Sequence, residues 1–178
     1  FLGVAVSHKG IDTFMDLLMD NKLKNKKINW YIIGEIDKSV EDNLIELKNK
    51  TNLNILGKYD ISNLDKILIK NKISLILLLS NVPETFSYTL TEAVQMNIPV
   101  VASNIGALGS RVVDGDFGWV YRNYEDLVEI IVNLVKNKKK IINKSQNLTK
   151  NKTNISVKKM ALNYASEYNS CLENKAFS

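Results

Sequence analysis

Two reactive residue types are almost absent from this sequence of 178 residues, which has a single cysteine, Cys171, and a single histidine, His8. One cysteine cannot form a disulfide within the chain, and its solitary thiol fits a reducing compartment. One histidine without cysteine or histidine partners makes no zinc site, so His8 is expected either in an exposed loop or along a ligand site. The sequence therefore excludes a disulfide framework and disfavours a zinc site.

Long hydrophobic runs and export signals are also missing. No apolar run reaches the length of a membrane span and no signal peptide is visible, so we expect a cytoplasmic location, at most peripheral to the inner face of the membrane. The phosphate-binding pattern Gly-x-x-x-x-Gly-Lys-Ser/Thr is absent, which disfavours ATP hydrolysis by that route. Because the chain opens without methionine, inside an expected strand, we expect a piece of a longer polypeptide.

What is present is an ordinary globular composition, with 45% hydrophobic and 24% charged residues, and a length that suits one domain. The formal net charge of +5 could attract phosphates, nucleic acid or an anionic membrane. Much of this charge lies in the stretch 136–152, rich in Lys and Asn. A solvated helix surface is the favoured interpretation of that stretch. A basic face held near anionic lipids is the alternative, and nucleic acid is not expected as a partner.

Apolar runs and amphipathic segments alternate along the chain. Strands are expected over 1–6, 28–33, 53–56, 74–80, 100–102 and 117–121, and helices over 11–19, 40–50, 62–70, the segment after Pro83, 123–135 and 157–172. A glycine loop is expected over 104–109. Strands that alternate with helices imply parallel pairing with right-handed crossovers. The predicted fold is α/β, a Rossmann-like three-layer sandwich whose parallel sheet has helices on both faces, in one domain over residues 1–178.

The most informative stretch is 83–93, Pro-Glu-Thr-Phe-Ser-Tyr-Thr-Leu-Thr-Glu-Ala. It lies between two apolar strands and begins a helix, whose first N–H groups face the carboxyl end of the preceding strand. That geometry suits a phosphate. Glu84 and Glu92 frame the helix start and share the charge sign of phosphate, so they are expected to accept hydrogen bonds from hydroxyl groups. A ligand with hydroxyls on both sides of a phosphate is a sugar nucleotide.

These residues also carry a family resemblance. Glu84 and Glu92, separated by seven residues, and the following Ile-Pro-Val-Val-Ala-Ser at 98–103 resemble the Glu-x7-Glu signature of retaining glycosyltransferases that use nucleotide sugars and have the GT-B fold. The resemblance extends from Lys9 to the Gly-Trp-Val at 118–120. It implies the C-terminal, donor-binding half of such an enzyme, which works with an N-terminal acceptor domain in surface polysaccharide or lipopolysaccharide synthesis. Alone, this half is expected to bind nucleotide and to transfer sugar poorly or not at all.

The resemblance implies a role for two carboxylates and a lysine. Glu92 would bind the ribose hydroxyls of the nucleotide, although with Thr89 it could simply form a capping box. Glu84 would bind hydroxyls of the donor sugar and help to orient the anomeric carbon, although it could be an ordinary carboxylate near a helix dipole. Lys9 would be the cation for the departing phosphate, or else a solvated loop lysine.

Backbone groups and one loop complete the expected site. The backbone N–H groups that would receive the diphosphate belong to Ser87, Tyr88, Thr89 and Leu90. By analogy the loop that contains Gly57 and Tyr59 would border the base, with Tyr59 either stacked on it or covering the core. The resemblance also implies a front-face route in which the leaving phosphate oxygen takes the proton of the acceptor, so that no nucleophile is needed. No metal and no cofactor is expected to be required. The Asp-Gly-Asp at 114–116 is interpreted as a surface turn rather than a metal site.

Two positions depart from the family pattern. Ser87 stands where members often have glycine, which narrows the approach to the donor sugar. Val4, five residues before Lys9, stands where members commonly have arginine, so one of two cations is missing unless Arg111 substitutes for it. That loss favours one alternative, a non-catalytic nucleotide-sugar-binding module. Further alternatives are a basic surface module for membrane or nucleic acid, and a sugar-nucleotide epimerase, whose acid and base groups are not evident.

Overall fold

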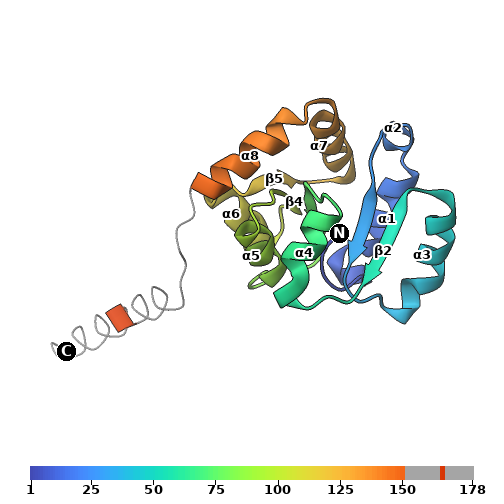
Figure 1. The fold of residues 1–178 in the computed structure, drawn as a ribbon, viewed down its shortest axis with the longest axis horizontal. Coiled ribbons are helices and arrows are strands. Elements are labelled where there is room, and N and C mark those ends of the chain that lie inside the picture. Colours follow the sequence, from blue (N-terminus) through green and yellow to red (C-terminus); the bar gives the residue numbers. More distant parts are fainter. Residues whose placement is uncertain (151–164, 167–178) are drawn as a thin grey trace.

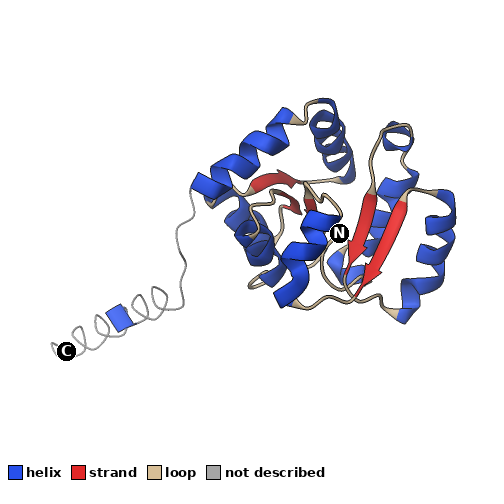
Figure 2. Cartoon of the chain, in the orientation of Figure 1, coloured by secondary structure: helices blue, strands red, loops and turns tan. Residues whose placement is uncertain are grey.

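The computed structural model describes residues 1–150 and 165–166, and its helices flank two parallel sheets (Figures 1 and 2). The first sheet pairs β1 (Trp30–Ile33) with β2 (Leu53–Gly57), and the second has the order β3 (Ile76–Leu78), β4 (Val100–Ser103), β5 (Gly118–Tyr121). Within the second sheet, Leu77 lies opposite Val101, and Val101 lies opposite Trp119. The parallel α/β architecture expected from the alternation of strands and helices is confirmed.

The segment at 1–6, expected as a strand, is only partly paired. It forms two isolated parallel bridges with the chain at β1, Leu2 with Ile33 and Ala5 with Ile36, and the N-terminus lies between the two sheets (Figure 2). The interruption comes at Gly3, whose φ of +106° is incompatible with an extended strand. A Cβ on Gly34 would lie 1.8 Å from the carbonyl oxygen of Gly3. Two glycines therefore pass in close contact here, and the expected single sheet is divided into two.

The helical segments of the described residues are η1 (Ser7–Lys9), α1 (Ile11–Met19), α2 (Asn21–Lys24), α3 (Lys38–Lys50), η2 (Ile61–Asn63), α4 (Leu64–Lys70), α5 (Tyr88–Gln95), α6 (Gly106–Asp114), α7 (Tyr124–Lys136) and α8 (Lys139–Lys150). Helices α1, α3, α4, α5 and α7 lie within a few residues of the expected helices. Helix α1 has the expected bounds, whereas the short α2 was not foreseen. Helix α5 stops before Asn97, whose φ of +56° turns the chain toward β4.

The expected glycine loop at 104–109 is wrong over most of its length, because helix α6 begins at Gly106. Glycine has a low helix propensity, which pointed to a loop. Gly109 is nevertheless helical and buried, since a Cβ there would lie 2.8 Å from the Cα of Asn104. Close packing of the helix on the end of β4 decides the conformation, and sequence periodicity carries no signal of that contact.

The basic stretch after α7 forms helix α8 as far as Lys150. Leu148 is buried, while Lys139 and Lys140 are exposed, in agreement with a solvated helix surface. The rest of that stretch, the helix expected over 157–172 and Cys171 fall outside the described residues, apart from a short helical piece at 165–166. Within residues 1–150 and 165–166, no helix is long and apolar enough to cross a membrane.

Alternate residues of the second sheet point to opposite layers, as a three-layer sandwich requires. Leu77 and Val101 pack in a core with side chains of α1, α3 and α7. Leu78 and Val100 pack on the other face with side chains of α4, α5 and α6. The first core also includes Ile32 of β1, so the two sheets share one layer of helices. Helix α5 is thereby anchored below the carboxyl ends of the strands.

Candidate functional site

A cavity of about 360 Å³ lies between the N-terminal segment, the loop after β2 and the start of α5. Six of the residues singled out in the sequence line it, namely Lys9, Tyr59, Glu84, Ser87, Tyr88 and Thr89. Gly57, Leu90 and Glu92 are not among the residues that line it. The structure therefore brings most of the expected site residues together at the carboxyl ends of the strands, where open α/β folds bind ligands.

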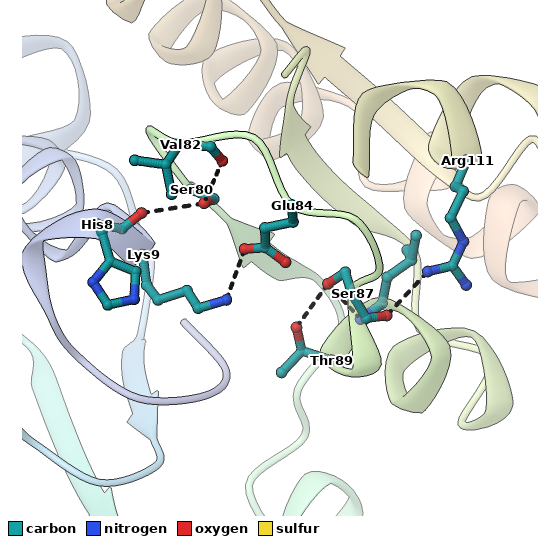
Figure 3. Close-up of polar contacts among 9 residues, drawn as sticks. His8, Lys9, Ser80, Val82, Glu84, Ser87, Thr89 and Arg111 are labelled. Carbon is teal, nitrogen blue, oxygen red and sulfur yellow. Dashed lines mark hydrogen bonds and ion pairs between the residues drawn. The ribbon is translucent and has the colours of Figure 1, made fainter. Parts of the chain in front are cut away.

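Lys9 and Glu84 both line this cavity, and their side chains point toward each other (Figure 3). The Nζ of Lys9 lies 2.8 Å from Oε1 of Glu84, and the lysine side chain is 40% exposed whereas the carboxylate is 12% exposed. The sequence suggested separate ligands for the two groups, a phosphate and a sugar. In the structure they are each other's partner, so a ligand that takes one must compete for it.

The loop that carries Lys9 is tied to the loop after β3. The hydroxyl of Ser80 lies 3.1 Å from each of two carbonyl oxygens, those of His8 and Val82, as Figure 3 shows. The side-chain amide of Asn81 donates to the carbonyl of Ser7 at 3.0 Å. These bonds hold Lys9 and Glu84 at a defined separation. His8 itself is exposed and contributes its carbonyl group to these ties.

Ser87 is the N-cap of α5. Its Oγ accepts from the N–H of Leu90 at 3.4 Å and lies 3.1 Å from Oγ1 of Thr89. The capping box of Thr89 and Glu92 considered from the sequence does not form, because the helix starts one residue before Thr89. The N–H of Leu90 is directed to Ser87, while those of Tyr88 and Thr89, in the first turn, have no intrahelical acceptor. An anion at this helix start would therefore accept hydrogen bonds from the N–H groups of Tyr88 and Thr89.

Arg111 braces this helix start from α6. Its Nη1 donates to the carbonyl of Ser87 at 3.1 Å, its Nη2 donates to Oγ1 of Thr91 at 3.0 Å, and its guanidinium lies 4.0 Å from the centre of the Phe86 ring. Burial lowers the pKa of Arg111 from its usual value. Arg111 is not in the cavity wall, whereas Val4 is. Arg111, considered as a substitute cation, therefore contacts the first turn of α5 and does not line the cavity.

A second lysine, Lys58, does line the cavity. Its Nζ lies 3.5 Å from Oε2 of Glu35, and both side chains are largely exposed. Sequence reasoning missed this cation, since its loop was assigned only to the border of the base. The signal available in the sequence was its position between Gly57 and Tyr59, two residues that were themselves expected in the site.

Glu92 lies on α5 and is fixed by Tyr59, whose hydroxyl donates to Oε2 at 2.7 Å. Burial, followed by the bond to Glu92, raises the pKa of Tyr59 above its usual value. Tyr59 thus connects the cavity wall to a carboxylate beside it. In the part of the chain that the structure describes, no three His, Cys, Asp or Glu side chains gather as metal ligands would. The Asp-Gly-Asp at 114–116 ends α6 in a turn, and Asp116 pairs with Lys144.

Known proteins with a similar sequence or structure are glycosyltransferases. MJ1178, an uncharacterised glycosyltransferase of Methanocaldococcus jannaschii, is 28% identical over 139 residues, which make up 77% of this chain and 38% of that protein. HepE of Anabaena in complex with UDP has a TM-score of 0.72 and 20% identity over 95% of this chain and 48% of that one. WaaG, involved in lipopolysaccharide biosynthesis, has a TM-score of 0.63 and 15% identity over 83% of this chain and 41% of that one.

The solved structures show that the fold is one half of GT-B, with strands and helices in the same arrangement. The chain spans less than half the length of each of these three proteins. The sequence profile of the glycosyl transferases group 1 matches residues 1–155. With that profile covering most of the chain, the protein belongs to the group 1 glycosyltransferase family.

Proposed function

We propose that this chain binds a nucleoside diphosphate sugar as the donor half of a retaining glycosyltransferase. The observation that carries the proposal is the 360 Å³ cavity in which Lys9, Glu84 and the N-terminus of α5 meet. A cation and a helix N-terminus suit a diphosphate, and a carboxylate suits hydroxyl groups. Family membership supports the reaction class.

Donor binding would exchange the partners of the ion pair. A diphosphate competes with Glu84 for the ammonium of Lys9, and the released carboxylate can then accept from hydroxyls of the donor sugar. Phosphate oxygens also accept from the first-turn N–H groups of α5 at Tyr88 and Thr89. The ribose is assigned to Glu92 and the base to the loop 57–59, part of which lines the cavity.

In the transfer step, the bond between the anomeric carbon and the phosphate oxygen breaks, and its electron pair stays on the phosphate. The acceptor hydroxyl oxygen bonds to the same face of that carbon, and its proton goes to the departing phosphate oxygen. The configuration is retained, and the step requires no protein nucleophile, metal or cofactor. Lys9 and the N–H groups of α5 stabilise the charge that develops on the diphosphate.

The acceptor site is assigned to a second domain across the cavity, because the chain spans 38% of MJ1178 and 48% of HepE. Three lining residues present exposed apolar side chains, Val4 at 48%, Phe86 at 48% and Tyr88 at 76%, which suit contact with a facing domain. The role of WaaG in lipopolysaccharide biosynthesis leads us to propose a surface polysaccharide or lipopolysaccharide as acceptor and a hexose as the transferred sugar.

Such acceptors are held at membranes, and α8 offers a basic surface for peripheral attachment through exposed lysines, including Lys139 and Lys140. Vesicle flotation tests this part of the proposal. Binding to anionic vesicles that falls with added salt, without binding to neutral vesicles, is expected. Equal flotation with both kinds of vesicle contradicts electrostatic attachment.

Calorimetric titration of the whole protein with UDP, GDP and dTDP tests donor binding. We expect one nucleotide to bind, and Glu92→Ala to weaken it about tenfold or more, because hydrogen bonds to a charged carboxylate contribute roughly 1.5 to 3 kcal/mol. Glu46→Ala, at an exposed carboxylate of α3 that pairs with Lys50, is the matched control and should bind normally. Absence of binding for all three nucleotides contradicts the proposal.

A non-catalytic nucleotide-sugar-binding module is the second candidate, favoured by one observation. Val4, where the family commonly has a cation, lines the cavity, so charge stabilisation of a leaving diphosphate rests on fewer groups. Transfer and donor-hydrolysis assays on the whole protein separate the two candidates. Tight nucleotide binding without turnover of any of a panel of nucleotide sugars favours the module, whereas turnover that Lys9→Ala abolishes favours the enzyme.

A further inference from the structure

Tyr59 and Glu92 form a contact that joins the two halves of the fold. Tyr59 follows β2 of the first sheet, Glu92 lies on α5 beside the second sheet, and the phenol hydroxyl donates to Oε2 of the carboxylate at 2.7 Å. The two residues are 33 positions apart in the chain. A bond of this length to a charged acceptor is at the strong end of the range.

The two partners stand in different relations to the cavity. Tyr59 lines it, whereas Glu92 does not line it and contacts it through Tyr59. The phenol is partly buried, and burial followed by its bond to Glu92 raises its pKa above the usual value. Among residues 1–150 and 165–166, the side-chain hydrogen bond that Glu92 makes is the one from Tyr59 to Oε2, and it does not involve Oε1. Tyr59 therefore holds Oε2 of Glu92 and leaves Oε1 able to accept a hydrogen bond from a ligand.

We propose that Tyr59 is a positioning residue that holds Oε2 of Glu92 and presents Oε1 to a ribose hydroxyl. The inference rests on the proposed function, in which Glu92 accepts from the ribose. A free glutamate side chain loses much rotamer freedom when it is fixed by a ligand. With Tyr59 in place that freedom is already lost before the nucleotide arrives, so the bond to the ribose costs less.

A purely structural tie between β2 and α5 would have the same geometry, and the ligand can distinguish the two roles. A structural tie affects every ligand of the cavity equally. A positioning role affects only ligands whose ribose carries hydroxyls for Glu92. The probe is therefore UDP or GDP, whichever binds in the titration described above, paired with its 2′,3′-dideoxy analogue.

Tyr59→Phe in the whole protein removes the hydroxyl and keeps the ring. We expect the affinity for the ribonucleotide to fall roughly three- to tenfold, and the affinity for the dideoxy analogue to change by less than about twofold. Tyr124→Phe is the matched control, since the hydroxyl of Tyr124 also donates to a carboxylate, Oδ2 of Asp20, at 3.2 Å, outside the cavity wall. It should change neither affinity. Thermal melting of both variants confirms that they are folded.

Three outcomes overturn the inference, and in each of them the nucleotide still binds to the unaltered protein, whereas the proposed donor binding fails when no nucleotide binds. Equal losses for the two nucleotides in Tyr59→Phe assign the contact to structure alone. If Glu92→Ala loses affinity for the nucleotide but Tyr59→Phe keeps it, Glu92 belongs to the donor site and Tyr59 has no role in it. Full affinity in Glu92→Ala removes the ribose role of Glu92, and the role of Tyr59 with it.

Discussion

Gly10 closes the loop that carries Lys9, and the absence of a side chain there lets the loop reach the end of β3. Its φ is +82°, and a Cβ would lie 1.9 Å from the carbonyl oxygen of Leu79. Alanine at this position must therefore displace the backbone of one of the two loops. We expect Gly10→Ala to lower the free energy of unfolding by about 4 kcal/mol or more, measured by urea denaturation.

Gly57→Ala is the matched control for this substitution. Gly57 has a similar φ of +74°, but nothing lies within 4 Å of the position of its Cβ. Only the strain of the left-handed backbone then remains, about 1 to 2 kcal/mol. Equal losses in the two variants would contradict the close approach of Gly10 to Leu79.

For the ion pair of Lys9 and Glu84, we expect a substitution to change nucleotide affinity much more than it changes stability. Because the lysine is 40% exposed, Lys9→Ala should lower the free energy of unfolding by only about 1 kcal/mol. The affinity for UDP, or for the nucleotide that binds, should fall about tenfold or more, because a charge-assisted bond to phosphate is lost. Affinity for the parent nucleoside should not change. Calorimetry with the two ligands checks this, and an equal loss for both contradicts a phosphate contact.

The sequence predicted which residues lie in the candidate site more reliably than which side chains contact each other there. Lys9, Glu84 and the start of α5 were expected in one site, and they line one cavity. That Lys9 binds Glu84, and that Tyr59 binds Glu92, depends on contacts between segments 75 and 33 residues apart. Helical and strand periodicity carries no signal of such pairs.

At the scale of the elements, α5 depends on α6 for the shape of its first turn. The carbonyl of Ser87 accepts from Arg111 at 3.1 Å, while its helical bond from the N–H of Thr91 is long, at 3.4 Å. A cation at this end of the helix is unfavourable for the helix dipole and favourable for an anionic ligand. Arg111 therefore holds the first turn of α5 through direct hydrogen bonds, although its charge opposes the helix dipole.

Arg111→Ala should accordingly loosen the start of α5. We expect faster hydrogen exchange at the N–H groups of Leu90 and Thr91, and a loss of about 1 to 2 kcal/mol in the free energy of unfolding, because a charged hydrogen bond and a cation–π contact with Phe86 are removed. Arg122→Ala, at an exposed arginine after β5, is the control. Unchanged exchange at α5 in Arg111→Ala contradicts the brace.

Elements with clear periodicity were predicted best. Helix α1 has the expected bounds Ile11–Met19, and the apolar run at 100–102 is β4. Two of the errors involve glycine. Gly3 interrupts the expected first strand through its positive φ, and Gly109 lies inside a helix where a loop was expected. In each case a close approach of two backbones decides the conformation, and local propensity cannot anticipate it.

At the scale of the whole molecule, three partly buried tyrosines couple stability to pH. Burial raises the pKa of Tyr121 to about 12, and burial is also the main cause of the raised pKa values of Tyr59 and Tyr124. The pKa of a tyrosine in the unfolded chain is about 10. Between these values the unfolded chain has released the proton while the folded chain retains it.

The folded state therefore binds more protons there, and the free energy of unfolding should decrease as the pH rises from about 10 to about 12. This stabilisation is fully present below pH 10. We expect about 1 kcal/mol from Tyr121, discounted because the ring is partly exposed. Urea denaturation near pH 9 and near pH 11 measures the decrease, and Tyr121→Phe should reduce it. Tyr88→Phe, at a side chain that is 76% exposed, should not. Lysines titrate equally in both variants, so an identical decrease in the two would assign the alkaline instability to general charge loss rather than to burial of Tyr121.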